Sequence, residues 1–468
     1  MNLDQKNAAL AISTLSSFLA PFMISGVNIA LPSIGKEFAA DAVTLSWIST
    51  AYLLAASMLL VPAGRLADIH GRKKVYTAGV IIYTLSALLL ASSTSVYEFI
   101  FYRLIEGVGA SMIFSTGIAI LTEVFPAGER GRALGINSAA VYLGLSLGPT
   151  LGGFLTQNYG WRSVFYVNLP IGAAAVALIC WKLKGEWAEA RGEKFDYWGA
   201  LLYMSILASV IYGFSLLPSP LGVLSLIAAL IGIPLFVKLE KKSKSPVLNV
   251  RVFENNKTFI YSNLSALINY AATFAVGFLM SLYLQYIKAL TPQQAGEILL
   301  AQPVIQALFS PAAGRLSDKI EPRLVASFGM VLCVIGLFMF SFLDALTDLN
   351  YITAGLMILG LGFALFSAPN TNAVMTSVAK KHLGVASATL ATMRLTGQVL
   401  SIGTAMTLFA IYVGHTQILP DKYPEFLISV KMAFTIFAAL CLLGVFTSLK
   451  RGKIRPGRKS DFSIPNPT

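Results

Sequence analysis

Apolar runs of about 20 residues recur along the whole chain, and short polar segments separate them. A run of that length crosses the hydrocarbon core of a bilayer as an α-helix. The alternation of apolar and polar residues typical of strands is absent, so helices rather than a β-barrel would satisfy the backbone hydrogen bonds in lipid. The pattern predicts fourteen membrane-spanning helices, at residues 8–31, 43–63, 75–93, 98–122, 133–155, 163–181, 198–217, 220–237, 259–284, 294–313, 324–343, 351–376, 386–412 and 428–449.

The composition agrees with an all-α polytopic membrane protein. Hydrophobic residues make up 56% of the chain and charged residues 12%, against about 25% charged in soluble domains. The three cysteines, Cys180, Cys333 and Cys441, fall inside apolar runs, which argues against a disulfide framework, and no spacing suits a metal. There is no Walker loop and no nucleophile–base set. We therefore expect no enzyme and no cofactor, and energy drawn from an ion gradient or from the gradient of the substrate.

The net charge of +13 reflects membrane topology. With the N-terminus in the cytoplasm, 28 of the 35 Lys and Arg residues fall in cytoplasmic segments, four in outer loops and three within spans. This bias predicts a multi-pass protein of the cell membrane with both termini cytoplasmic. The basic excess would attract anionic lipid, and it gives no reason to expect nucleic acid as a partner. We expect the protein to be monomeric.

One short pattern occurs twice. Gly64-Arg65-Leu66-Ala67-Asp68 returns as Gly314-Arg315-Leu316-Ser317-Asp318, 250 residues later, and two further echoes keep offsets of 249 to 252. A fixed offset indicates a duplicated unit, which the first six and last six spans carry. The predicted domains are a six-helix bundle at 1–183, a linker with two inserted helices at 184–257, a second six-helix bundle at 258–450 and a disordered cytoplasmic tail at 451–468.

The repeated pattern lies at the predicted cytoplasmic ends of spans. A carboxylate there can accept from a helix N-terminus, and arginines can bridge to a neighbouring helix. We interpret these loops as a latch on the inner gate; charge that only sets topology is the alternative. The candidate gating residues are Gly64, Arg65, Asp68, Gly71, Arg72, Gly314, Arg315 and Asp318.

The fifth span carries a glycine stripe. Gly144, Gly148 and Gly152 recur every four residues and share one helix face, where a neighbouring backbone can come close. Pro149 removes one helical hydrogen bond and permits a bend. These four residues predict a tightly packed hinge between the two bundles, and ordinary small-residue packing is the alternative.

Longer motifs resemble one known family. The loop GRLADIHGRKK at 64–74, the stretch RLIEGVG at 103–109, the fifth-span glycines and the stretch WRSVFYVNLPIG at 161–172 are similar to motifs of the major facilitator superfamily, and within it of the fourteen-span drug:proton antiporter branch. The resemblance covers nearly all of residues 10–450. It implies two six-helix bundles plus two inserted helices, around a central cavity that opens alternately to each side. In span one, Met23 stands in place of an Asp that the branch commonly has.

Arg103 and Glu106 lie three residues apart on one face of the fourth span, where they can pair. A charge at this depth costs about 2.5–3.5 kcal/mol or more and therefore faces protein or water. We interpret Glu106 as the proton-coupling carboxyl, with Arg103 as its partner, and as a replacement for the acid missing at Met23. A static pair that stabilises the bundle is the alternative.

Polar and aromatic residues inside the spans predict a broad apolar pocket with a few polar anchors. Each one alone also fits a hydrogen bond between helices, and Arg394 fits a cavity cation and a structural partner equally. The candidate cavity residues are Met23, Asn28, Tyr52, Tyr142, Asn269, Gln302, Gln306, Asn370, Asn372 and Arg394.

Together these features predict a proton-coupled antiporter that exports amphipathic compounds, cationic ones included. Its partners would be a small-molecule substrate, protons and the lipid bilayer. A carrier of one metabolite, or an uncoupled facilitator of the same superfamily, stays open because of Met23. A membrane sensor that binds a ligand without moving it is a second alternative, although the short inner loops offer no signalling domain.

Overall fold

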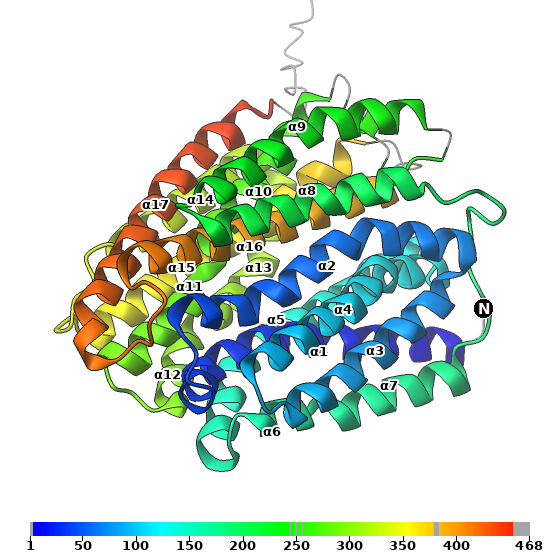
Figure 1. Cartoon of the computed structure of the whole chain (residues 1–468). Coiled ribbons are helices and arrows are strands. Elements are labelled where there is room, and N and C mark those ends of the chain that lie inside the picture. Colours follow the sequence, from blue (N-terminus) through cyan, green and yellow to red (C-terminus); the bar gives the residue numbers. More distant parts are fainter. Residues whose placement is uncertain (1–2, 244, 249, 254–255, 379–382, 453–468) are drawn as a thin grey trace, which may run out of the picture.

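The computed structural model describes residues 3–243, 245–248, 250–253, 256–378 and 383–452, and this part of the chain forms helices and no strand (Figure 1). The predicted tail therefore lies, from residue 453 onward, outside the described residues. The helices are α1 (Leu3–Glu37), α2 (Ala42–His70), α3 (Arg72–Ser92), α4 (Val96–Val124), α5 (Ala127–Tyr159), α6 (Arg162–Tyr166), α7 (Asn168–Lys182), α8 (Tyr197–Leu216), α9 (Pro220–Lys242), η1 (Val250–Phe253), α10 (Lys257–Thr273), α11 (Ala275–Leu282), the π-helical turn η2 (Tyr283–Ile287), α12 (Pro292–Leu299), α13 (Ala301–Lys319), α14 (Pro322–Phe340), α15 (Leu349–Thr376), α16 (Leu383–Tyr412), η4 (Pro420–Lys422) and α17 (Tyr423–Lys450).

Thirteen helices of the described chain are long and apolar enough to cross a membrane, which confirms the predicted all-helical membrane fold. Most of these helices run past the predicted ends, because they continue beyond the apolar core into polar segments. The span predicted at 294–313 is not among the thirteen. It is interrupted at Leu300, between α12 and α13, as the predicted spans 163–181 and 259–284 are interrupted at Val167 and Phe274, but it is also less apolar than they are. Pro303 has no N–H to bond the carbonyl of Leu299, and Gln302 and Gln306 lower the hydropathy of this stretch.

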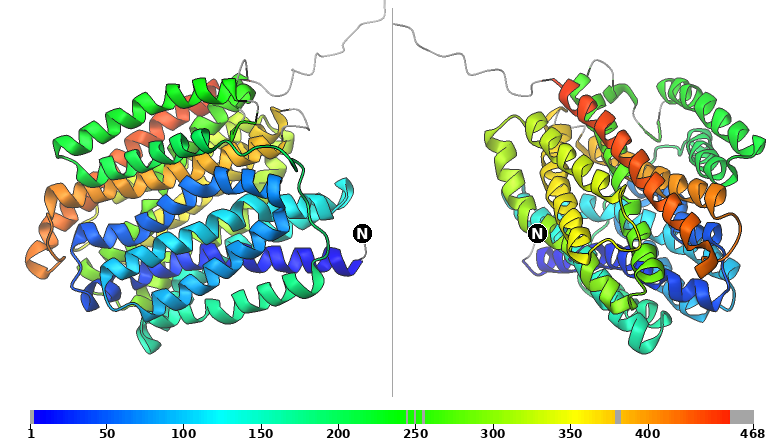
Figure 2. Two further views of the ribbon diagram at one scale, coloured as in Figure 1. Left: turned by 45° about the vertical axis from the view of Figure 1, so that its right-hand side comes forward. Right: turned by 90° about the vertical axis from the view of Figure 1, so that its left-hand side faces the viewer.

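The helices pack in one order that occurs twice. Among the first helices, α1 packs on α5, α4 lies against both α2 and α3, and α3 packs on α7. Among the last, α10 packs on α16, α15 lies against both α13 and α14, and α14 packs on α17. The first group (α1–α7) and the second group (α10–α17) lie beside each other (Figure 2). The correspondence matches α2 with α13, the two helices that carry the repeated Gly-Arg-Leu pattern.

The pair α8 and α9 lies on one side of the line where the two groups meet (Figure 2). Helix α8 bonds to a helix of each group. The Tyr203 hydroxyl donates to the carbonyl of Ser57 in α2 at 3.1 Å, and the Thr407 hydroxyl of α16 donates to the carbonyl of Phe214 at 2.9 Å. Helix α8 therefore links the first group to the second.

The groups also contact each other directly, and these contacts include α5 with α12, α2 with α16, and α1 with α11. In α1, Pro32 has no N–H, which frees the carbonyl of Asn28 four residues earlier. The Ser281 hydroxyl donates to that carbonyl at 2.6 Å, and the Gln285 side chain donates to the carbonyl of Ile29 at 3.0 Å. Side chains of the second group thus satisfy backbone groups of the first, as apolar surroundings require.

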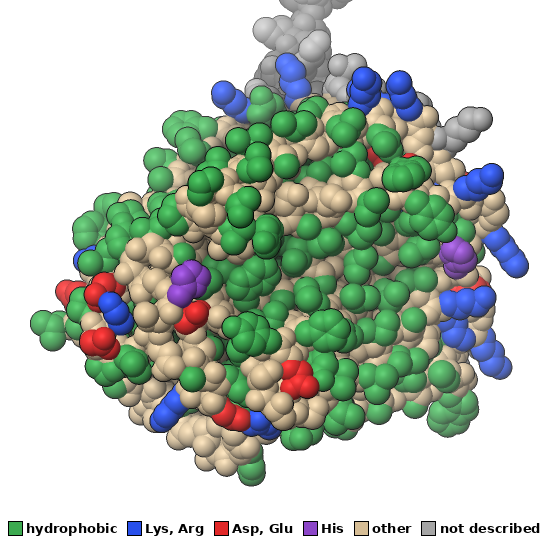
Figure 3. Space-filling view, viewed as in Figure 1, with side chains coloured by type: hydrophobic (Ala, Val, Ile, Leu, Met, Phe, Trp, Pro, Cys, Tyr) green, Lys and Arg blue, Asp and Glu red, His purple; other side chains and the backbone are tan. Residues whose placement is uncertain are grey.

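The surface divides along the helix axes. Hydrophobic side chains cover the middle of the molecule, Lys and Arg gather toward the right-hand and upper edges of the view, and Asp and Glu are most frequent toward the left (Figure 3). An apolar belt between charged ends is the surface that a bilayer requires.

Candidate functional site

The two charged residues of the fourth span form a buried ion pair. The side chains of Arg103 and Glu106 are 2% and 0% exposed, so neither faces lipid. Arg103 Nε donates to the carbonyl of Ile48 in α2 at 3.0 Å, and its guanidinium lies 4.5 Å from the centre of the Tyr52 ring. Glu106 Oε1 has no hydrogen-bond partner among the described residues. Arg103 is therefore held by α2 as well as by Glu106.

Two glycines of α4 explain why the pair is enclosed. A Cβ on Gly107 would lie 2.5 Å from the carbonyl oxygen of Tyr52, and a Cβ on Gly109 would lie 2.6 Å from the backbone nitrogen of Tyr83. Glycine at both positions lets α2 and α3 approach α4 closely. This approach places the buried rings of Tyr52 and Tyr83 beside Glu106.

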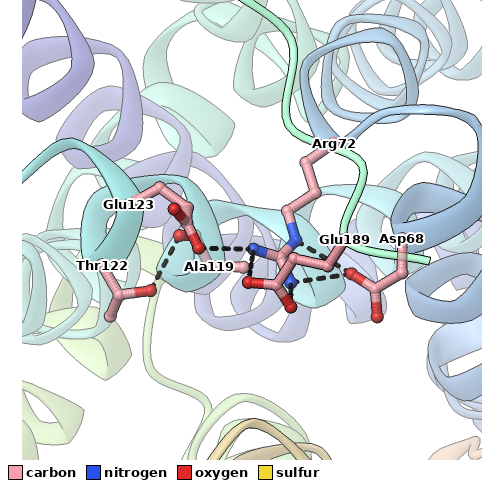
Figure 4. A network of polar contacts seen from close by, with 6 residues as sticks. All are labelled: Asp68, Arg72, Ala119, Thr122, Glu123 and Glu189. Carbon is pink, nitrogen blue, oxygen red and sulfur yellow. Dashed lines mark hydrogen bonds and ion pairs between the residues drawn. The ribbon is translucent and has the colours of Figure 1, made fainter. Parts of the chain in front are cut away.

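A second cluster of charges lies at the end of α2, at the first copy of the repeated pattern (Figure 4). The Arg72 guanidinium contacts three carboxylates: Asp68 at 2.8 Å, Glu189 at 2.9 Å and Glu123 of α4 at 3.2 Å. Glu189 belongs to the loop between α7 and α8. Its hydrogen bond with Glu123 and the charge of Arg72 lower the pKa of Glu189. One arginine thus joins α2, α4 and the loop.

Residues 186–193 of that loop, which we call the strap, lie across the pattern. The N–H of Arg72 donates to the carbonyl of Trp187 at 2.8 Å, and the N–H of Ala190 donates to the carbonyl of Asp68 at 2.9 Å. Gly71 has a positive φ of 120°, and a side chain there would collide with Glu186. Two backbone hydrogen bonds and the missing side chain at Gly71 thus let the strap pack closely on the end of α2.

The far end of the strap is held by an ion pair. Glu193 lies 2.6 Å from Arg65. Hydrogen bonds from Ser245 and from Arg65 lower the pKa of Glu193. The structure thus brings the gating residues of the first copy together under the strap, within the first group, while their role as a latch stays a prediction.

The second copy of the pattern has different surroundings. A Cβ on Gly314 would meet nothing within 4 Å, and Arg315 is exposed. The side chain of Asp318 lies outside the described part of the structure. The strap thus covers the first occurrence of the pattern, whereas at the second Gly314 and Arg315 are uncovered and Ser317 is buried against Asn372.

The glycine stripe of α5 packs on α1 of the same group. A Cβ on Gly144 would lie 2.5 Å from the carbonyl oxygen of Phe18, and one on Gly152 would lie 2.8 Å from the Cα of Gly26. Gly148 faces Ser25 in the same way. The backbone of Pro149 lies against the second group, because a Cβ on Gly296 of α12 would meet the carbonyl oxygen of Pro149. The predicted hinge therefore has one face within the first group and one toward the second.

Two of the expected cavity residues, from opposite groups, lie near enough to interact electrostatically. Tyr142 of α5 is half-buried and lies within interaction distance of Arg394, Tyr270 and the hydroxyl of Ser310. Arg394 Nη2 donates to the hydroxyl of Thr371 at 2.6 Å, and its guanidinium lies 5.6 Å from the centre of the Tyr270 ring.

The structure does not gather the other expected cavity residues around Arg394 through any described contact. The Met23 sulfur contacts Asn168 of α7, and Asn269 lies against Cys333 of α14, so both side chains face the interior of their own group. Tyr52 covers Arg103, as described above. The remaining residues lie on the α1–α11 contact (Asn28), on α13 (Gln302, Gln306) and on α15 (Asn370, Asn372).

Sequence reasoning missed the strap, Tyr83, Thr371 and the tight contact of Gly153 with α12. The strap carries a signal, because Glu186, Glu189 and Glu193 are acidic residues in a segment that otherwise supplies basic charge. The contact of Gly153 carries none, since a glycine does not reveal which helix approaches it.

A model of the Major Facilitator Superfamily matches residues 13–239 and 263–463. The riboflavin transporter RibZ of Clostridioides difficile (strain 630) is 30% identical over 450 residues, which are 96% of this chain and 98% of that protein. The multidrug resistance protein Stp of Mycobacterium tuberculosis (strain ATCC 25618 / H37Rv) is 30% identical over 396 residues, 83% of this chain and 73% of that protein.

Solved structures share the fold at low identity. A bacterial homolog of the human lysosomal transporter Spinster, in an inward-facing and unoccupied conformation, matches with a TM-score of 0.69 and 13% identity over 96% of this chain and 97% of that one. A D-xylose-proton symporter matches with a TM-score of 0.68 and 13% identity over 95% and 97%.

Proposed function

The chain belongs to the Major Facilitator Superfamily, and we propose that it works as a proton-coupled antiporter that exports amphipathic small molecules by alternating access. Membership of this family makes it a membrane transporter and not an enzyme. Relatives named multidrug resistance or multidrug transporter proteins support an amphipathic cargo. The helix packing that recurs in the two groups supports two bundles, 1–183 and 258–450, that move against each other.

We also propose the fourteen-span arrangement of the drug:proton antiporter branch. Helices α8 and α9 would be the inserted pair, and α12 with α13 would form one broken span. The gathering of Lys and Arg toward one side (Figure 3) supports cytoplasmic termini in the cell membrane. The strap would then lie on the cytoplasmic side, and the transporter would act as a monomer with protons and lipid as its other partners.

The observation that carries the proton coupling is the buried carboxyl of Glu106. Its pairing with Arg103 is lost when it takes a proton, so the two protonation states favour different arrangements of α2 and α4. Helix α2 also packs on α16 of the second group. A protonation change in the first group thus has a physical route to the contact between the groups. A proton from outside would neutralise Glu106 and favour release of the cargo.

Glu106→Gln tests this proposal. In proteoliposomes with an imposed pH gradient, the wild type should drive a fluorescent amphipathic dye against its gradient, and a protonophore should abolish this movement. The variant keeps the shape of the side chain but cannot change protonation, so it should lose pH-driven transport.

The matched control for this experiment is Glu98→Gln. Glu98 lies in the first turn of the same helix but is half-buried rather than fully buried, and it accepts from the backbone of Thr94. This variant should transport like the wild type. Wild-type rates of pH-driven transport by Glu106→Gln would contradict the proposal.

A carrier of one metabolite is the second candidate. The relative named riboflavin transporter matches nearly the full length of both chains, which supports a defined planar cargo. The buried Met23 in span one supports it too, because this position has no carboxyl. Transport of a single compound from a mixed panel, unaffected by a protonophore, would favour this candidate over drug export.

A further inference from the structure

A second arginine within a spanning helix, Arg394 of α16, differs from Arg103 in its partners. Arg103 is neutralised by Glu106, whereas Arg394 forms no ion pair with any Asp or Glu of the described chain. Arg394 stands eleven residues after Leu383, the start of α16, which is about 16 Å along the helix axis. An unpaired cation at this depth is costly, and such residues mark ligand pathways.

The known bonds of Arg394 leave most of its guanidinium unused. A guanidinium has five N–H donors in a planar fork. Nη2 donates to Thr371, the ring of Tyr270 lies 5.6 Å away, and the buried Nε has no hydrogen-bond partner among the described residues. The fork is therefore available to an acceptor that the chain itself does not provide.

The surroundings of Arg394 come from both groups and are partly aromatic. Tyr142, on α5 of the first group, lies near enough for the charge of Arg394 to act on its hydroxyl. The rings of Tyr270 and Phe363 meet edge to face, with centres 5.2 Å apart. Gln398 lies one turn further along α16, on the face of Arg394, and its buried Oε1 has no hydrogen-bond partner in the described chain.

We propose that Arg394 binds the anionic group of the transported molecule, and that the cargo of this transporter is an aromatic organic anion. This inference rests on the proposed transport function and names the substrate class of its central site. A carboxylate, sulfonate or phosphate supplies the missing counter-charge and matches the planar fork in a bidentate way. Tyr270 and Phe363 offer an aromatic wall to the body of the molecule. Glu106, the carboxylate that would attract a cationic drug, already belongs to Arg103.

Two dyes with one skeleton test the charge preference. Fluorescein and rhodamine 123 share a three-ring xanthene body, and at neutral pH the first is an anion and the second a cation. Binding to the purified full-length protein in detergent is measured by fluorescence anisotropy. The wild type should bind fluorescein at least about tenfold more tightly than rhodamine 123, because a hydrogen-bonded charge pair is worth about that factor or more.

Variants then assign the preference to one side chain. Arg394→Gln should weaken fluorescein binding about tenfold or more and leave rhodamine 123 binding unchanged or improved. The fluorescein affinity of Arg394→Lys should lie between those of the wild type and Arg394→Gln, since lysine keeps the positive charge and lacks the planar guanidinium. Lys431→Gln is the matched control, because it also removes one positive charge from a spanning helix, α17, and should bind as the wild type does. Thermal unfolding in detergent confirms that each variant is folded.

Equal affinity of the wild type for the two dyes would overturn the inference, whether or not any variant folds. A folded Arg394→Gln variant with wild-type affinity for fluorescein would also overturn it. Transport is measured separately in proteoliposomes. Selective binding of fluorescein without proton-linked transport would support the site at Arg394 and contradict the proposed antiport. Proton-linked transport of both dyes without a charge preference would support the antiport and contradict the site at Arg394.

Discussion

Gly153→Ala should weaken the contact between α5 and α12 and shift the transporter away from the conformation described here. Gly153 lies on the side of α5 that faces the second group, next to the start of α12. This contact joins the two groups directly, so any alternating-access movement that separates α5 from α12 must break it.

The size of the effect follows from the space at Gly153. An added Cβ would lie 3.0 Å from the Cα of Gln293 and closer still to the carbonyl oxygen of Pro292, whereas ordinary contact begins near 3.4 Å. The obstructing atoms are backbone, so α12 itself must retreat by at least about 0.4 Å. Overpacking of this kind costs about 1–3 kcal/mol. Only the closed arrangement bears this cost, so its population relative to open ones should fall by about 5- to 150-fold.

Disulfide cross-linking measures this population. The N–H of Gln293 donates to Gln157 Oε1 at 3.3 Å, so cysteines at these two positions should cross-link rapidly when α5 and α12 are in contact. The three native cysteines are first replaced. Gly153→Ala should then slow oxidative cross-linking severalfold or more.

Gly135→Ala is the matched control for Gly153→Ala. It is the same substitution in the same helix, with the same gain in helix propensity, but its Cβ would meet nothing within 4 Å. Equal cross-linking rates in the two alanine variants would refute the reasoning.

Two further predictions concern the strap. Asp68→Asn removes the ion pair with Arg72 at 2.8 Å, which is worth about 0.2–1 kcal/mol at this partly exposed site. The variant should therefore be expressed like the wild type and transport up to about fivefold more slowly. Wild-type transport at normal expression would rule out the latch. The folded-state pKa values of Glu189 and Glu193 lie below their usual values, so the stabilisation that these carboxylates give the strap is present above about pH 4.3 and is lost as pH falls through the folded-state values. The amide of Ala190 should therefore keep its hydrogen-exchange protection at pH 5–7 and lose it at lower pH. Protection that does not change with pH, after correction for intrinsic exchange rates, would contradict this prediction.

The positions of the spanning helices could be predicted because each depends on a local run of apolar residues. The division at Leu300 was not predicted, although Pro303 and two glutamines stood in the sequence, since an apolar run with one proline also fits a bent helix. The Arg103–Glu106 pair was predictable from helix periodicity alone.

Contacts between distant segments were beyond sequence reasoning. Nothing in the order of residues joins Glu189 to Arg72, or brings Tyr142 near Arg394, because each proximity depends on how whole helices are arranged. The glycine stripe shows the same limit. The spacing of the glycines predicted that they share a helix face, but the partner of that face is α1 of the same group. The next glycine, Gly153, contacts the second group, which its place in the fifth-span motif did not predict.

The position of α8 has a consequence for how cargo reaches the protein. Because α8 bonds to α2 through Tyr203 and to α16 through Thr407, it lies over the contact between α2 and α16 and would shield this flank from the acyl chains. An amphipathic molecule dissolved in a leaflet would then enter sideways only along the opposite flank, where α5 faces α12 and α13. The inserted pair α8 and α9 would thus leave the side of α5 as the one lateral route from the bilayer into the space between the groups.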